Sequence, residues 1–431
     1  MKKRAVITGL GPVTPVGTGK EAYWSALLSG KSGAKRIDFK DCDMDQYGSR
    51  IACPVEGFSI TDFVEKTKDI KHLGRTSQFA LAGARLALDD AGFDLNVIER
   101  GKGQRGYAIK NVDPGEIGVI LGVGGENMDL CEKYHQIFLE HHGPKKVSPF
   151  ALPHIIVSSV TANVSNKFGI QGKSLSVSTA CSSSTHAIIE AYMAILMGKE
   201  TLMVTGGADA CITPYVFGGF DTLKAMSRRN EEPEEASRPF DRDRDGFVMG
   251  EGSGIIILEE LNHALERGAH IYCEIKGFGA TADAHHIIAP DPDAGAQARA
   301  IRDALERAGA HPEEIDYINA HGTSTPLNDV TETSAIKEAL GEYAYCIPIS
   351  STKSMTGHLI GGAGGIEVIA TALMIERGKI HATINLETPG DGCDLNYVPK
   401  EPIKKSIGKA IKVNFAFGGY NAALVLERWG I

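Results

Sequence analysis

The sequence predicts an α/β fold with mainly parallel strands, because short β-branched runs alternate with helical stretches along the chain. The runs end at or just before Gly, Ser or Thr, which are residues typical of turns. The expected strands cover residues 5–8, 117–121, 175–177 and 202–205, and the expected helices cover 21–28, 76–91, 185–197 and 296–308.

The chain also has the pattern of two duplicated halves. A strand, a Ser/Thr turn and an apolar or small-residue helix occur in this order over residues 177–198 and again over 349–378. A helix ends near Arg267 and a strand at 271–275 follows, which indicates that the second half begins here. No low-complexity linker separates the halves, so we expect residues 1–268 and 269–431 to pack as one unit.

The composition is that of a globular protein with an acidic balance. Of the 431 residues, 42% are hydrophobic, and the net charge of −9 argues against a nucleic-acid-binding protein, which is usually basic. No apolar run is long enough to span a membrane, and the first is too short for the core of a signal peptide. The eight cysteines show no CxxC spacing, so we expect reduced thiols in a cytoplasmic protein.

Two motifs suggest ligand sites but fail in detail. Residues 9–14 begin like a dinucleotide fingerprint, but the third glycine is missing and prolines interrupt the helix that should follow. Residues 241–246 resemble a calcium loop, but Arg242 and Arg244 place positive charge inside it. We therefore expect a salt-bridge cluster at 241–246 and no bound metal, because the adjacent histidine pairs also lack further ligands.

Four polar segments stand out, at residues 178–184, 319–325, 351–358 and 414–421. Each follows a β-branched or apolar run and therefore lies at the carboxyl end of an expected strand. Open α/β sheets place their active sites at those ends. We therefore expect the four segments to form one site.

Cys181 lies in the first segment, directly before a helix that is apolar nearly all round. We expect this helix to be buried and to hold the cysteine rigidly. A helix N-terminus also lowers the pKa of a cysteine thiol, and the thiolate is the effective nucleophile for a thioester. His321 and His358 lie in the second and third segments, which makes them the candidate catalytic partners of Cys181.

These segments resemble the active-site motifs of β-ketoacyl-[acyl-carrier-protein] synthases of the elongating Cys-His-His type. The similarity runs over nearly the whole chain and includes residues 238–241, 245–252 and 414–421 in the right order. The resemblance implies a five-layered αβαβα thiolase fold, which agrees with the duplicated halves.

The resemblance also implies a decarboxylative Claisen condensation. Cys181 takes the acyl chain from a carrier, and a malonyl thioester on acyl carrier protein loses CO₂ to give an enolate that attacks the acyl group. His321 and His358 donate hydrogen bonds to the enolate oxygen, and donors aimed at developing charge contribute roughly 3–4 kcal/mol each. The backbone N–H groups of Cys181 and Phe417 match the oxyanion hole of the family, and Lys353 matches a lysine that orders the site.

Further positions match binding residues of the family. Thr323 and Thr325 match residues that bind the pantetheine arm. Lys145 and Lys146 match a docking patch for the acidic acyl carrier protein, and Arg229 matches another. The resemblance implies no bound cofactor, because the phosphopantetheine of the carrier holds the substrate.

The acidic residues that follow His321 need a separate interpretation. Asp329 and Glu332 match acidic positions of the family. We expect them to pair structurally with Lys353 or with backbone groups.

A few positions depart from a housekeeping fatty-acid enzyme. Ala416 stands where the family usually has Gly, in a loop that gates the acyl pocket, and Tyr420 replaces a usual Thr or His. Gly125 and Glu126 occupy a place where a bulky apolar residue often sets the chain length. We expect Gly125 and Ala416 to contact the acyl chain.

Three functions remain open at this point. The first is a homodimeric fatty-acid elongating synthase. The second is the ketosynthase subunit of a type II polyketide or polyene synthase, in a heterodimer with a homologous chain-length partner. The third is a non-catalytic chain-length partner, and Cys181 argues against it because such partners lack the nucleophile.

Overall fold

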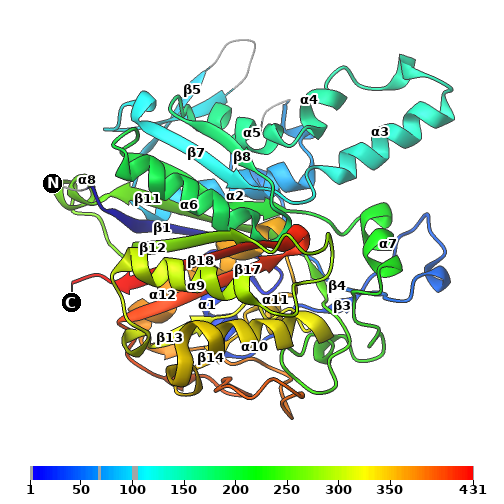
Figure 1. Ribbon diagram of the computed structural model, residues 1–431. Coiled ribbons are helices and arrows are strands. Elements are labelled where there is room, and N and C mark those ends of the chain that lie inside the picture. The colour runs from blue at the N-terminus through cyan, green and yellow to red at the C-terminus, as the bar shows by residue number, and fades with distance from the viewer. Residues whose placement is uncertain (1–2, 67–68, 100–104, 431) are drawn as a thin grey trace.

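The computed structural model describes residues 3–66, 69–99 and 105–430, and a large mixed sheet runs through the molecule (Figure 1). Its strands are β1 (Ala5–Thr14), β2 (Gly17–Thr18), β7 (Ile117–Gly122), β8 (Ser174–Val177), β9 (Leu202–Asp209), β11 (Gly252–Glu260), β12 (Cys273–Ala282), β13 (Tyr317–Asn319), β14 (Ile349–Ser350), β17 (Lys409–Ala416) and β18 (Tyr420–Arg428). Within the described ranges this sheet has 11 strands in the order β14-β13-β17-β18-β12-β1-β11-β9-β7-β8, with β2 paired to β1.

The two halves of the sheet repeat one pairing pattern. In the first half, β1 and β9 both pair antiparallel with β11, and β9 and β8 both pair parallel with β7. In the second half, β12, β18, β17, β13 and β14 repeat this sequence of directions. The predicted duplication is therefore confirmed. The expectation of mainly parallel strands is wrong, because strands buried on both faces are continuously apolar whatever their direction.

Helices separate and cover the two halves of the sheet. They are α1 (Lys20–Leu28), α2 (Arg75–Asp90), α3 (Met128–Glu140), α4 (Ala151–Ile155), α5 (Ser158–Phe168), α6 (Ser183–Leu196), α7 (Pro214–Thr222), α8 (Leu261–Glu266), α9 (Gly295–Ala308), α10 (Pro326–Leu340), α11 (Lys353–Thr356) and α12 (Ala363–Arg377). Helices α6 and α12 contact strands of both halves, whereas α2 and α5 cover the first half and α9 and α10 the second. The layers are therefore α2 with α5, the first half of the sheet, α6 with α12, the second half of the sheet, and α9 with α10. This is the five-layered arrangement of a thiolase-type fold.

The predicted helices and strands all appear in the structure, with shifted ends. One of the largest shifts is in β1, which continues through residues 9–14, where the dinucleotide motif was rejected. The glycines in this segment allow α2 to pack closely on the strand. A Cβ on Gly9 would lie 2.1 Å from the oxygen of Ala87, and one on Gly11 would lie 2.0 Å from the oxygen of Gly83.

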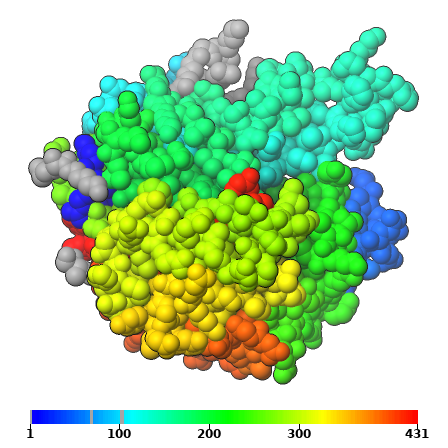
Figure 2. Space-filling view, viewed as in Figure 1, coloured from blue at the N-terminus to red at the C-terminus, as the bar shows by residue number. Residues whose placement is uncertain are grey.

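Smaller elements surround this core. They are β3 (Lys35–Arg36), β4 (Ile51–Cys53), β5 (Leu95–Glu99), β6 (Arg105–Ile109), β10 (Met249–Gly250), β15 (Lys379–Ile380) and β16 (Ile403–Lys404). The arm formed by α3 and α4 projects from the body at the upper right (Figures 1 and 2). In the same view the red C-terminal segment reaches the surface between the green and the yellow parts of the chain. Among the described residues, no helix is both long and apolar enough to cross a membrane.

Candidate active site

The candidate nucleophile Cys181 lies between a strand and a buried helix. It belongs to a short 3-10 turn, η6 (Ala180–Ser182), which connects β8 to α6. Ala180 adopts a positive φ of 48°, a conformation that costs a non-glycine residue roughly 1–3 kcal/mol. The cysteine is only 7% exposed, and α6 is buried on most of its faces, as predicted.

The two candidate histidines converge on this cysteine from the second half of the fold. His321 follows β13, and His358 lies between α11 and the turn η10 (Ile360–Gly362) that leads into α12. The Cys181 sulfur and one ring nitrogen of each histidine lie within 4.8 Å of one another. The two imidazole rings are nearly perpendicular, with centroids 5.4 Å apart. The structure therefore joins the three residues that the sequence singled out.

Hydrogen bonds fix which nitrogen of each histidine carries the proton. The N–H of Ile360 donates to Nδ1 of His358 at 3.2 Å. Nδ1 of His321 lies 3.0 Å from the amide nitrogen of Asn414 and 3.2 Å from the Lys353 ammonium, and both are donors. Each Nδ1 is therefore an acceptor, and the proton of each neutral ring is on Nε2.

This tautomer also bears on metal binding at the site. A thiolate and two imidazoles can be zinc ligands, and a metal-binding histidine usually donates its second N–H to an acceptor. Here Nδ1 of His321 and Nδ1 of His358 face donors instead. Their Nε2 atoms are therefore arranged to donate hydrogen bonds into the site, which suits a developing oxyanion better than a metal ion.

The charge states follow from burial and from the nearby lysines. Burial lowers the pKa of His321 and that of His358 well below the ordinary value, and the positive charge of Lys353 lowers both further. Both rings are therefore neutral at pH 7. Burial raises the pKa of Cys181 to about 11, so the expected lowering at the helix N-terminus is wrong for the protein without substrate.

Two backbone N–H groups face the sulfur of Cys181. These are the N–H of Cys181 itself and the N–H of Phe417, and each favours the thiolate. Phe417 begins the short turn η11 (Phe417–Gly419), which follows β17 and includes Gly418 at a φ of 81°. The structure thus brings the two expected oxyanion-hole donors to the same atom.

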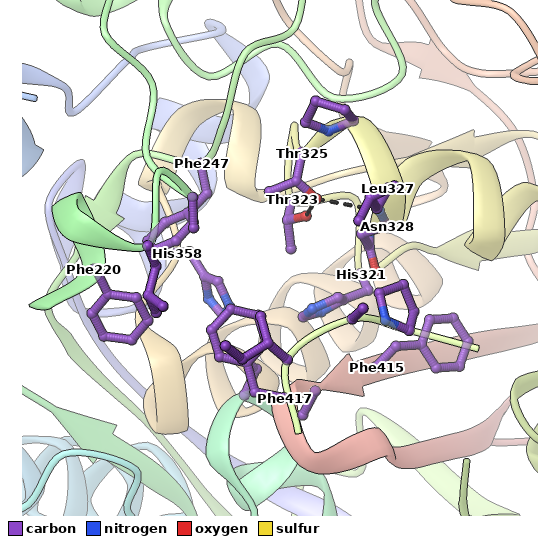
Figure 3. Close-up of a pocket in the computed structure, with 18 of the residues that line it drawn as sticks. Phe220, Phe247, His321, Thr323, Thr325, Leu327, Asn328, His358, Phe415 and Phe417 are labelled. Atoms are coloured by element: carbon purple, nitrogen blue, oxygen red, sulfur yellow. Dashed lines mark hydrogen bonds between the residues drawn. The ribbon is translucent and has the colours of Figure 1, made fainter. Parts of the chain in front are cut away.

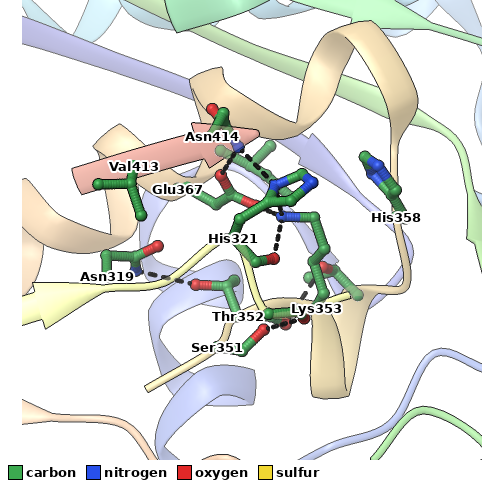
Figure 4. A network of polar contacts seen from close by, with 12 residues as sticks. Asn319, His321, Ser351, Thr352, Lys353, His358, Glu367, Val413 and Asn414 are labelled. Carbon is green, nitrogen blue, oxygen red and sulfur yellow. Dashed lines mark hydrogen bonds and ion pairs between the residues drawn. The ribbon is translucent and has the colours of Figure 1, made fainter. Parts of the chain in front are cut away.

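A buried network of charges lies behind His321 (Figure 4). The Lys353 ammonium forms an ion pair with Glu367 and donates to the backbone oxygen of His321 at 2.6 Å. Lys412 pairs with the other oxygen of Glu367 at 2.8 Å, and Asn414 donates to that same oxygen at 3.0 Å. Although burial opposes ionisation, the two lysines hold the pKa of Glu367 below its ordinary value. The sequence analysis missed Glu367 and Lys412.

The acidic residues after His321 support the backbone, as expected, but not Lys353. Glu332 accepts the N–H groups of His321 at 2.6 Å and of Gly322 at 2.7 Å. Asp329 accepts the N–H of Phe240 at 2.7 Å. The expected alternative was an ion pair between these carboxylates and Lys353. It is wrong, because Lys353 forms its ion pair with Glu367.

Cys181, His321 and His358 open onto a pocket of about 230 Å³ (Figure 3). Most of its wall is apolar and comes from α7, β17, the start of α10 and the segment before α9. The lining includes the predicted contacts Thr323, Thr325, Ala416 and Phe417, together with Phe220, Leu223, Lys224, Phe247, Ile288, Gln297, Leu327, Asn328 and Phe415. The hydroxyls of Thr323 and Thr325 are hydrogen-bonded to each other at 3.0 Å.

Gly125 is not among the residues that line this pocket, and its contact with the acyl chain stays a prediction. A Cβ at Gly125 would lie 2.2 Å from the sulfur of Cys211, so no space for a larger side chain remains there. Asp209, which the sequence analysis also missed, binds this segment. Its carboxylate accepts the N–H of Gly125 at 2.8 Å and the N–H of Gly361 at 2.7 Å. It therefore connects the Gly125 loop to the segment that carries His358.

The other predicted positions lie on the surface. Lys145 and Lys146 are exposed, on the turn η5 (Pro144–Lys146) that follows α3. Arg229 is half-buried, and its guanidinium donates to the backbone oxygen of Asp243 at 3.1 Å, which leaves it less available than the lysines. Tyr420 is 41% exposed.

The segment 241–246 is a salt-bridge cluster, as predicted. The Asp241 carboxylate accepts a hydrogen bond from the Arg238 guanidinium at 2.9 Å and further hydrogen bonds from backbone N–H groups. Arg244 donates to the backbone oxygen of Thr325 at 3.1 Å. This cluster therefore supports one side of the pocket.

Comparison with known proteins agrees with this geometry. The chain matches the beta-ketoacyl synthase N-terminal domain over residues 2–264 and the beta-ketoacyl synthase C-terminal domain over residues 272–387. It is 44% identical to the 3-oxoacyl-[acyl-carrier-protein] synthase 2 of Synechocystis sp. over 428 residues, which cover 99% of both chains.

Solved structures show the same similarity. A beta-ketoacyl synthase from Burkholderia phymatum STM815 superposes with a TM-score of 0.88 at 36% identity, over 99% of both chains. A second match is a type II polyketide synthase ketosynthase, solved in complex with its acyl carrier protein and bound to the hexaketide. It superposes with a TM-score of 0.89 at 33% identity, over 99% of this chain and 100% of that chain. The chain belongs to the beta-ketoacyl synthase family, a family of acyl-condensing enzymes.

The buried network leads to a prediction about stability. In Glu367→Gln, Lys353 and Lys412 lose the carboxylate with which both form ion pairs, while both remain buried. Removing one partner of a buried ion pair costs about 3–5 kcal/mol, so the free energy of unfolding in urea at pH 7 should fall by that amount. Glu376→Gln, a partly exposed position on the same helix, is the matched control and should change it by about 1 kcal/mol or less. Equal losses in the two variants would contradict the assignment.

Proposed function

We propose that the protein elongates acyl chains by a decarboxylative Claisen condensation. Cys181 accepts an acyl group, and a malonyl-acyl carrier protein supplies the two-carbon unit, which gives a β-ketoacyl-acyl carrier protein in fatty-acid synthesis. The observation that carries this proposal is the convergence of one thiol with two Nε2–H donors at the base of an apolar pocket. The name of the Synechocystis relative supports the substrate class.

The first step transfers the acyl group to Cys181. The cysteine sulfur attacks the thioester carbonyl of the incoming acyl carrier, and the bond from that carbonyl to the pantetheine sulfur breaks. The thiol proton leaves with the pantetheine sulfur. During this step the carbonyl oxygen gains negative charge, and the N–H groups of Cys181 and Phe417 are placed to stabilise it.

The second step forms the enolate. The bond between the malonyl α-carbon and its carboxylate breaks, CO₂ leaves, and the electron pair moves toward the thioester oxygen. His321 and His358 are neutral and present Nε2–H donors, so they stabilise this oxygen without delivering a full positive charge. The enolate carbon then attacks the acyl carbonyl on Cys181, and the cysteine sulfur leaves.

The position of the catalytic residues also supports the proposed division at residues 268 and 269. Cys181 belongs to the first half, and His321, Lys353 and His358 belong to the second. The active site of the proposed enzyme therefore forms only where the two halves pack against each other.

A second candidate function is the ketosynthase subunit of a type II polyketide synthase. The ketosynthase with the bound hexaketide favours it, because that structure matches the whole chain closely. The strand β8 ends the sheet order and exposes Leu175, so we also propose that a second copy or a homologous subunit pairs there. Condensation by the purified chain alone would support fatty-acid elongation, whereas a strict need for a homologous partner would support the polyketide function.

We further propose that the protein works in the cytoplasm. All eight cysteines are free in the structure, which agrees with the reduced thiols expected from the sequence.

Replacing the nucleophile tests the first step. Cys181→Ser should abolish condensation, because a neutral hydroxyl is a much weaker nucleophile than a thiol. Intact-mass measurement after incubation with an acyl carrier thioester should show one added acyl group on the wild type and none on the variant. Acylation of another residue in the wild type would overturn the assignment.

Replacing the histidines tests the second step. His321→Ala and His358→Ala should still accept the acyl group on Cys181 but release CO₂ from labelled malonyl-acyl carrier protein about 100 to 1,000 times more slowly. Cys181 and its helix remain in both variants, so acylation serves as the internal control. Undiminished CO₂ release in both would rule out the proposed roles.

The docking patch can be tested by reversing its charge. Acyl carrier proteins are acidic, so Lys145→Glu combined with Lys146→Glu should raise KM for carrier-bound substrates several-fold at low salt. Alkylation of Cys181 by a small thiol reagent should not change, because the patch lies outside the pocket. The same reversal at the adjacent lysines Lys404, which is exposed, and Lys405, which is half-buried, is the control. An equal effect of both reversals would point to net charge rather than to a docking site.

A further inference from the structure

Two buried polar atoms on the pocket wall lack a hydrogen-bond partner among the described residues. One is Nε2 of His358, a donor that the proposed mechanism assigns to the thioester oxygen. The other is Oε1 of Gln297, an acceptor in the first turn of α9. The Gln297 side chain is only 1% exposed. A buried acceptor without a donor is costly, so this atom has a reason to meet one on a ligand.

The other polar side chains on this part of the wall already have partners. Thr323 and Thr325 are bonded to each other, and Thr325 also accepts the N–H of Asn328 at 3.3 Å. The Asn328 amide donates to Asp329 at 3.1 Å and to Glu332. The oxygen of Gln297 differs from these side chains because it is buried on the pocket wall with no donor among the described residues.

The backbone around Gln297 is held firmly. The Thr281 hydroxyl on β12 donates to the backbone oxygen of Ala296, the preceding residue, at 2.6 Å. Helix α9 packs directly on β12 as well, since a Cβ on Gly279 would lie 1.8 Å from the oxygen of Ala300. The side-chain amide is thus presented from a fixed position, which favours selective binding.

Building on the proposed function, we propose that Gln297 binds an amide group of the pantetheine arm. The pocket requires a ligand that offers an acceptor to His358 and a donor to Gln297. A pantetheine thioester has both, because its thioester oxygen accepts and its amide N–H groups donate. The hydrocarbon of an acyl chain offers neither, and the carbonyls of a polyketide only accept.

The test compares two thioesters of one acyl group, one made with pantetheine and one with butanethiol, which has no amide. Acylation of Cys181 is followed by intact mass, so no condensation is needed. The wild type should prefer the pantetheine thioester, and Gln297→Met should reduce that preference about fivefold, the value of one hydrogen bond between neutral groups. Gln297→Glu keeps an acceptor at this position and should therefore retain part of the preference for the pantetheine thioester. Arg299→Met, on the exposed face of the same helix, should keep the full preference.

The possible outcomes separate this proposal from the proposed function. An equal loss with both thioesters in Gln297→Met would assign Gln297 a structural role and overturn the proposal, as would an unchanged preference. Gln297→Leu provides a second amide-free variant if the methionine variant does not fold. If neither thioester acylates Cys181 in the wild type, the proposed function itself fails. If the wild type is acylated without any preference for pantetheine, only the role of Gln297 fails.

Discussion

The buried group of Lys353, Glu367 and Lys412 is the constraint on which the rest of the active site depends. Its members come from α11, α12 and β17, and all are at most 1% exposed. Two cations around one carboxylate leave a net positive charge inside the protein, and this charge helps to keep His321 and His358 neutral. Because Lys353 also faces Nδ1 of His321, the same network places the proton of that ring on Nε2. This cluster of charges thus reinforces the neutral state that burial imposes on both rings, and it helps to fix the tautomer of His321.

The backbone close to each of the three catalytic candidates is strained. Ala180, Ser324 and Ile360 all have a positive φ, and each lies within three residues of Cys181, His321 or His358. Such conformations cost roughly 1–3 kcal/mol each and persist only where the surrounding structure stabilises them. The contact of α6 with η10 supplies part of this support, because the Ser184 hydroxyl donates to the backbone oxygen of Gly361. The packing of the two halves therefore stabilises the site as well as the fold.

The sequence predicted the elements and the reactive residues better than their surroundings. Strand ends, helices and the three reactive residues carry local signals, namely β-branched runs, apolar periodicity and polar segments after strands. The partners of Lys353 carry no such signal, because their contacts depend on how α11, α12 and β17 pack. One signal was available: Glu367 is the only charged residue between Ala363 and Ile375, a segment otherwise made of apolar and small residues and Thr371. The role of Gly125 at the acyl pocket is predicted from the resemblance alone, and its close approach to the sulfur of Cys211 could not be known from the sequence.

The raised pKa of Cys181 was also hidden from the sequence, and it limits how acylation can occur. A thiol with a pKa of about 11 is mostly protonated at pH 7, so the proposed acylation has to include loss of the thiol proton. Neither histidine can accept that proton through Nε2, which already carries one, and each Nδ1 is occupied by donors. The proposed first step therefore passes this proton to the sulfur that leaves with the pantetheine arm. In the proposed reaction, acylation then depends on the alignment of the arm in the pocket, so residues on the pocket wall would influence the chemical step as well as binding.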